Sequence, residues 1–185
     1  MQTPTDIQKN IVIPTLTKLG LYTLTAEKLL MGTAAVESRF AFRRQFNGGP
    51  ALGLFQMEPA TFNWLMTGFL ASKKHVNLKK TVLQIAGKDK PIPSDLVIND
   101  AFAAAMARVR YYAVSVPLPS ALKDQAFYWW RHYNGESPHG LKPADYLERW
   151  NKLCAPLYGI SHDYSPPDSF NAPESVKPLS RPIWV

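Results

Sequence analysis

Apolar residues recur at steps of three and four along most of the first 160 residues. This repeat is typical of amphipathic helices. It predicts helices over residues 5–20, 25–37, 59–72, 77–86, 99–116, 120–133 and 143–155. No segment shows a convincing strand pattern. We therefore predict an all-α domain over residues 1–160.

Short polar motifs suggest where individual helices begin. Thr5-x-x-Gln8 has the form of a capping box, Thr25 can cap the second helix, and Ser120 can cap a later one. Pro14 should kink the first helix, because proline lacks the amide hydrogen that a continuous helix needs.

The pattern changes after residue 160. Residues 161–185 contain five prolines and little periodic apolar patterning. Because proline fixes φ and lacks an N–H, this composition excludes a helix and disfavours a sheet. We predict an extended Pro-rich C-terminal arm. Its apolar residues favour packing on the body or on a partner: Phe170, Ile183, Trp184 and Val185.

Composition limits the class of protein. The chain of 185 residues is 46% apolar and 19% charged, enough to bury a sizeable core. Lys and Arg number 21 against 14 Asp and Glu, so the net charge is +7. A basic body attracts any polyanion, so charge alone names no partner. No apolar stretch reaches the roughly 20 residues of a membrane span, so we expect no transmembrane segment and no secretory signal.

Glu37 is the most informative residue for function. It shares the largely apolar side of the helix over residues 25–37 with Leu30 and Ala34. Removal from water disfavours the charged form of a carboxyl and raises its pKa, as a general acid working near neutral pH requires. The alternative is an exposed acid at a helix end, paired with Arg39 or Arg43.

Motifs around Glu37 follow one another in a particular order. They are Ala35-Val36-Glu37-Ser38-Arg39-Phe40, a glycine-rich loop, Gly53-Leu54-Phe55-Gln56-Met57 and His132-Tyr133-Asn134-Gly135. Together they resemble the soluble lytic transglycosylase and goose-type lysozyme family, over about residues 25–135. The helix over residues 99–112 looks like the long helix that this family places before the last motif. The resemblance implies a lysozyme-like helical fold.

The resemblance also implies roles for individual residues. Glu37 would be the catalytic acid and Ser38 its neighbour in a Glu-Ser pair at the substrate. Phe55 would line the cleft, and Gln56 would bind sugar.

The last motif would complete the site. Tyr133 would hydrogen-bond Glu37, and Asn134 would help to shape the site. The aromatic run over residues 127–133 is otherwise expected to pack in the core, with Tyr133 and at most one Trp reaching the cleft. The chain departs from the family pattern at His132, in a basic insertion over residues 73–90, and in lacking a glycine in the helix over residues 99–112.

A single acid suffices for the chemistry that the resemblance implies. In a transglycosylase, the glutamate protonates the glycosidic oxygen and then helps to remove the proton from the sugar's own 6-hydroxyl. Glu58 is the only other acid between Glu37 and Asp89, and its place at a helix start explains it without catalysis. We expect no metal and no cofactor, because the histidines lack metal-ligand spacing and Cys154 is the only cysteine.

The leading interpretation is a lytic transglycosylase that cleaves peptidoglycan between N-acetylmuramic acid and N-acetylglucosamine. Without a secretion signal, such a domain could reach the wall in a bacteriophage tail or baseplate, docked on neighbouring subunits through residues 161–185. The alternatives are a hydrolytic endolysin and an inactive structural or wall-binding protein of the same fold. A nucleic-acid binder has only the charge in its favour, since no helix carries the expected basic stripe.

Overall fold

The computed structural model describes residues 2–45, 48–136 and 140–160. Regular structure in this part of the chain is helical, and β pairing is limited to isolated bridges of Leu52 with Arg44 and Met57. The all-α prediction is confirmed. The predicted arm over residues 161–185 lies outside the described residues.

The N-terminal helical segment is built from α1 (Pro4–Ile7), η1 (Gln8–Val12) and α2 (Ile13–Lys18). Thr3 and Asp6 form the capping box, so the prediction of a box at Thr5 is wrong. The segment η1 is a wide π-helical turn, in which the Ile13 N–H bonds to the Gln8 carbonyl. This turn ends at Val12, two residues before Pro14, whose ring would clash with a carbonyl one turn back in a regular α-helix.

The central helix α3 (Leu24–Ser38) is buried along most of its length. Its N-cap is Thr23, whose side chain accepts a hydrogen bond from the Ala26 N–H, so the prediction of Thr25 as the cap is wrong. Gly32 permits close packing against α9 (Pro143–Leu153), because a Cβ at this position would lie 2.0 Å from the Tyr146 hydroxyl oxygen.

The remaining helices include the predicted ones, in order and with altered ends, together with short helices over residues 73–75 and 95–98 that the apolar pattern did not predict. They are α4 (Pro59–Trp64), η3 (Leu65–Phe69), η4 (Lys73–His75), α5 (Val76–Ala86), α6 (Asp95–Ile98), α7 (Asp100–Tyr112), α8 (Leu122–His132) and η5 (Ala155–Tyr158). The helix predicted to run to residue 116 stops at Tyr112. Ala121, and not Ser120, is the N-cap of α8, with no side-chain hydrogen bond there.

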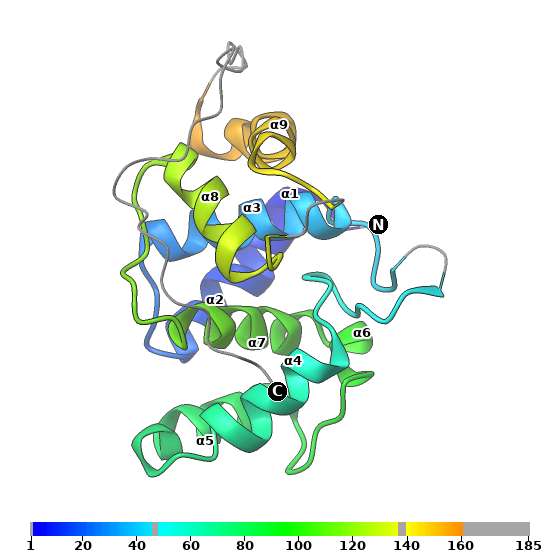
Figure 1. Ribbon diagram of the computed structural model, residues 1–185, viewed down its shortest axis with the longest axis vertical. Helices are drawn as coiled ribbons and strands as arrows, with labels where there is room; N and C mark the ends of the chain where they lie inside the picture. The colour runs from blue at the N-terminus through cyan, green and yellow to red at the C-terminus, as the bar shows by residue number, and fades with distance from the viewer. Residues whose placement is uncertain (1, 46–47, 137–139, 161–185) are drawn as a thin grey trace.

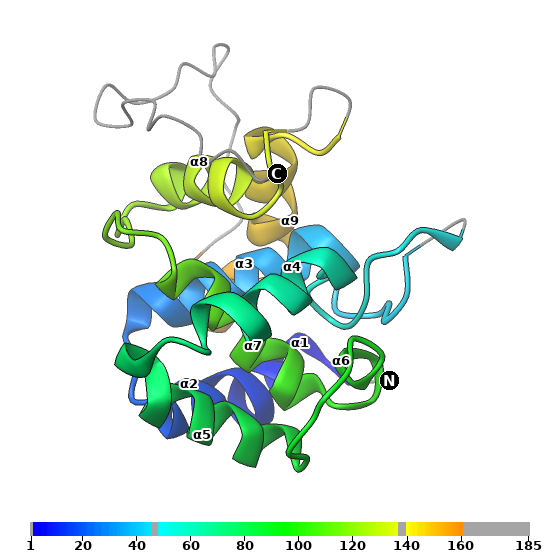
Figure 2. The same ribbon diagram turned by 60° about the horizontal axis from the view of Figure 1, so that its bottom comes forward.

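The helices spread along the long axis of the molecule (Figure 1). Helices α8 and α9 lie toward one end and α5 toward the other, with α3 and α7 between them in both views (Figure 2). The largest fully buried side chains include Trp129 on α8, Trp150 on α9 and Tyr111 on α7. No helix in the described ranges is long and apolar enough to span a membrane.

Candidate active site at Glu37

Glu37 lies one residue before the C-terminal end of α3, with its side chain only partly buried. Its Oε1 accepts a hydrogen bond of 2.9 Å from the Trp129 indole nitrogen on α8. Burial raises the pKa of the Glu37 carboxyl to about 7, against the lowering effects of the Trp129 hydrogen bond and the Arg149 charge. A carboxyl with this pKa holds a proton in a large fraction of molecules at neutral pH, as a general acid must.

The two nearby arginines do not give Glu37 the exposed ion pair of the alternative interpretation. Arg43 forms a two-point ion pair with Asp100 at the start of α7, with distances of 2.6 and 2.7 Å. Arg39 is exposed and adopts a left-handed conformation that ends α3. The structure therefore supports the interpretation of Glu37 as a partly desolvated acid.

Arg149 on α9 supplies the positive charge that lowers the pKa of the Glu37 carboxyl. One guanidinium nitrogen donates to the backbone carbonyl of Val36, in the last turn of α3. The last carbonyls of a helix lack partners within it, and a cation there also offsets the helix dipole. Arg149 thus stabilises the end of α3 and limits how far the Glu37 pKa rises.

Tyr133 forms a different hydrogen bond from the one expected. Its hydroxyl donates to the Phe55 carbonyl at 2.9 Å, while Trp129 bonds to Glu37. Burial raises the pKa of the Tyr133 phenol, and the Glu37 charge raises it further, so the two side chains do lie within electrostatic range. Tyr133 follows the last residue of α8, and its hydroxyl reaches the turn at residues 53–57 instead of Glu37. The predicted hydrogen bond between Tyr133 and Glu37 is therefore wrong.

That turn is held mainly by its own backbone. Leu52 and Met57 exchange two hydrogen bonds. Gly53 has φ +75°, and a Cβ there would lie 2.5 Å from the Leu96 carbonyl oxygen, so the position requires glycine. Gln56 also has positive φ, and its amide nitrogen donates to the Gly53 carbonyl at 2.8 Å. The amide nitrogen of Gln56, predicted to bind sugar, is thus engaged within the turn.

Three other predicted site residues have mainly structural contacts. Phe55 is 1% exposed, so its side chain packs in the core and does not line a cleft. Ser38 is also 1% exposed, and its hydroxyl donates to the Ala34 carbonyl of its own helix. The Asn134 amide donates to the Leu141 carbonyl and fixes the chain after α8.

Sequence reasoning missed the roles of Trp129 and Arg149. Trp129 precedes Tyr133 by one helical turn, so the two residues share a face of α8. This spacing indicates Trp129 as a second candidate donor to Glu37. Arg149 lies 113 residues from Val36, and nothing local marks it as a partner of α3.

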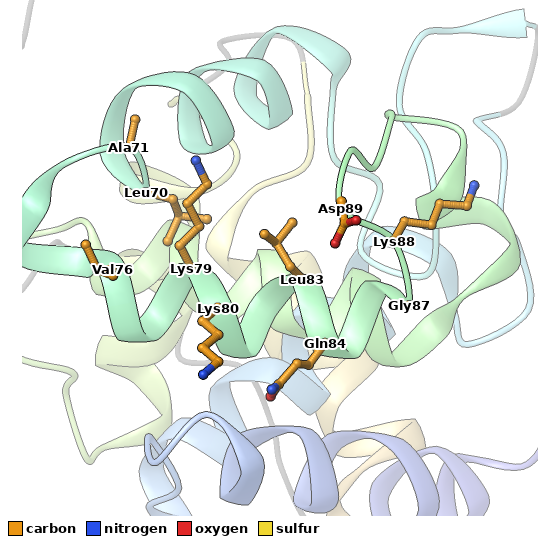
Figure 3. Close-up of a pocket in the computed structure, with 10 residues that line it drawn as sticks. All are labelled: Leu70, Ala71, Val76, Lys79, Lys80, Leu83, Gln84, Gly87, Lys88 and Asp89. Carbon is orange, nitrogen blue, oxygen red and sulfur yellow. The ribbon is translucent and has the colours of Figure 1, made fainter.

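The two cavities that stand out in the structure lie away from Glu37. One, of about 670 Å³, runs along α5 and is lined by Leu70, Leu83, Lys79 and Asp89 among others (Figure 3). The other, of about 500 Å³, lies near Asp95 and Ile98. In the described part of the chain, no three His, Cys, Asp or Glu side chains gather as a metal site would require.

No protein-family model, curated protein or solved structure matches this chain. The case for a function therefore depends on the residues around Glu37 and their chemistry.

Proposed function

We propose that the chain is a lytic transglycosylase of lysozyme-like fold, which cleaves peptidoglycan between N-acetylmuramic acid and N-acetylglucosamine. The observation that carries the proposal is the state of Glu37. Its carboxyl is partly buried, accepts one hydrogen bond from Trp129, and has a pKa that burial raises to about 7. These are the properties of a proton donor that works near neutral pH.

In the first step, protonated Glu37 gives its proton to the oxygen of the glycosidic bond. The bond between C1 of the muramyl sugar and that oxygen breaks, and the departing sugar leaves with a free 4-hydroxyl. The Trp129 N–H keeps the carboxyl in place before and after the transfer.

In the second step, the Glu37 carboxylate removes the proton from the 6-hydroxyl of the same muramyl sugar. The 6-oxygen bonds to C1 and closes a 1,6-anhydro ring. Glu37 regains the proton that it gave away, and no water is consumed.

The surroundings of Glu37 favour cyclisation over hydrolysis. Glycoside hydrolases ordinarily use two carboxylates that flank the scissile bond. Within the described residues, the groups that shift the pKa of Glu37 are Trp129 and Arg149, and no second carboxylate is among them. Glu58 is the exposed N-cap of α4, where the helix dipole accounts for it.

As to its setting, we propose a virion-associated tail or baseplate protein of a bacteriophage, in contact with the wall and with neighbouring subunits through residues 161–185. The net charge of +7 would attract the protein to an anionic wall.

Digestion of purified peptidoglycan, followed by mass spectrometry, tests the proposed enzymatic activity. Anhydro products, one water lighter than hydrolysed ones, would support the proposal. Hydrolysed products would favour an endolysin, and intact glycan would favour an inactive structural protein.

The digestion has a matched pair of variants. Glu37→Gln keeps the shape of the side chain but removes its titratable proton, so it should give no products. Glu58→Gln makes the same chemical change at an exposed helix cap and should digest as the unaltered protein does.

A further inference from the structure

Within the described residues, the Arg110 guanidinium has no carboxylate partner, and it lies near Tyr133 of the candidate active site. It lies in the last turn of α7 and is partly buried. Its guanidinium carbon stands 5.8 Å from the centre of the Trp64 ring on α4. Burial lowers the pKa of Arg110, and the ionisable groups that act on it are the phenols of Tyr133 and Tyr111.

Tyr133 links this cation to the proposed acid. The charges of Glu37 and Arg110 both act on the Tyr133 phenol, in opposite directions. The Tyr111 ring, adjacent in sequence to Arg110, lies 5.2 Å from the Tyr133 ring. Arg110 and Glu37 therefore approach the same tyrosine, one from α7 and one from α3.

The neighbouring histidine adds no second positive charge beside Arg110. Burial first, then the charges of Arg131 and Arg110, lowers the pKa of His132 to about 4. His132 is thus neutral at pH 7, and it does not repel an anion bound at Arg110.

Several other cations of the described chain differ from Arg110. Arg43 pairs with Asp100, and the exposed Lys88 pairs with Asp95. Arg108, also on α7, lies over the Tyr112 ring and is only 8% exposed, which leaves little surface for a ligand. Arg110 differs because it remains partly exposed beside Tyr133.

We propose that Arg110 binds a carboxylate of the glycan substrate and so makes the enzyme specific for anionic strands. The inference rests on the proposed function and adds a substrate-binding residue to it. Trp64 covers one face of the guanidinium, while the N–H groups along its edges fit the two oxygens of a carboxylate. In a partly desolvated place such a charge-assisted pair is stronger than on an open surface.

Steady-state kinetics on two soluble substrates test the assignment. One is glycan strands stripped of peptides, whose lactyl carboxylates are free, and the other is the same strands after conversion of the carboxylates to amides. The unaltered enzyme should show a lower KM for the carboxylate strands. Arg110→Gln should raise that KM by about tenfold, the size of one charge-assisted hydrogen bond, and leave the KM for amidated strands unchanged. Arg110→Lys keeps the positive charge but not the paired N–H groups of the guanidinium. Its KM for carboxylate strands should lie between those of the unaltered enzyme and Arg110→Gln.

Arg108→Gln is the matched control, because it removes the same charge from the same helix at a residue closed to solvent. The ratio of the two KM values does not depend on how much of a variant is folded. Arg108→Gln should leave this ratio unchanged. An equal effect of Arg110→Gln on both substrates would overturn the inference.

Binding separates this inference from the proposed function. If the unaltered protein cleaves neither substrate, the proposed function fails, and calorimetry with the same two strands decides the role of Arg110. If the carboxylate strands bind more tightly than the amidated strands, and Arg110→Gln abolishes this difference, the inference is supported. Equal affinity for the two strands would overturn it.

Discussion

The helix α3 carries a glutamate near each end, one buried and one partly buried, and the two have different surroundings. Glu27, in the first turn, is 2% exposed and accepts hydrogen bonds of 2.8 to 2.9 Å from Gln8, Tyr22 and Tyr158. Glu37, in the last turn, accepts one hydrogen bond, from Trp129. Burial raises the pKa of Glu37 to about 7.

The difference shows that burial alone does not make a proton donor. The N-terminal end of a helix favours negative charge and the C-terminal end disfavours it. At Glu27, the carboxyl oxygens accept three hydrogen bonds and lie in the first turn of α3. At Glu37, the helix end and the loss of water act together against the charged form. We infer that Glu27 stabilises the fold, whereas the proposed function requires Glu37 to give up a proton.

The largest expected effect is on activity. Glu37→Gln should lower the rate of peptidoglycan cleavage by about 10⁴-fold, because general acids contribute up to about that much and Glu37 is the sole candidate. The measurement is release of soluble fragments over time. Circular dichroism should show an unchanged fold, and a variant that keeps half of the activity would remove Glu37 from the mechanism.

Glu27→Gln should lower stability and leave the activity unchanged. The amide offers one acceptor oxygen and places hydrogens against donors from Gln8, Tyr22 and Tyr158. We expect a loss of about 3 kcal/mol in the free energy of unfolding, measured by urea denaturation, with unchanged activity per folded molecule. Loss of activity without loss of stability would break the comparison.

The comparison also predicts how stability depends on pH. The pKa of Glu37 is raised from 4.5 in the unfolded chain to about 7 in the folded one. The folded state therefore keeps a proton that the unfolded state has released between these values, and stability falls as pH rises through that range. Between pH 4 and pH 8 the protein should lose about 2 kcal/mol relative to Glu37→Gln, less than the full shift because water reaches part of the side chain. If the urea midpoints of the unaltered protein and of Glu37→Gln change equally with pH, this prediction is contradicted.

The smallest effect concerns the one partner of Glu37. Trp129→Phe removes the N–H that lowers the Glu37 pKa, so the alkaline limb of the pH profile of kcat/KM should move up by about half a unit to one unit. Trp150→Phe is the matched control, because its buried indole nitrogen has no hydrogen-bond partner in the described structure. A shift of equal size in both variants would mean that repacking, and not the hydrogen bond, is responsible.

The apolar pattern predicted the helices and the place of Glu37, but not the polar details. Two of the three wrong caps lie two residues from the true ones, because Thr3 and Thr5, like Thr23 and Thr25, offer equivalent side chains in succession. Local sequence does not choose between such neighbours, since the packing of each helix decides which threonine stays outside it.

The partners of the two glutamates depend on contacts between distant segments. Trp129 lies 92 residues from Glu37, and Tyr158 lies 131 residues from Glu27. No spacing rule within one helix reports on such pairs. The apolar face of the helix therefore indicates Glu37 as a candidate acid. The predicted donor, Tyr133, is wrong because Trp129 donates instead, and nothing in the sequence marks the hydrogen bonds at Glu27.

The most direct test of the different roles of the two glutamates is the titration of Glu37 itself. Carbon NMR of protein with labelled glutamate carboxyls follows each carboxyl through the pH range, and the Glu37→Gln variant identifies the Glu37 signal by its absence. Glu37 should titrate near pH 7, far above its pKa of 4.5 in an unfolded chain. A midpoint near 4.5 would show a solvated, ionised Glu37 and would contradict its role as the proton donor.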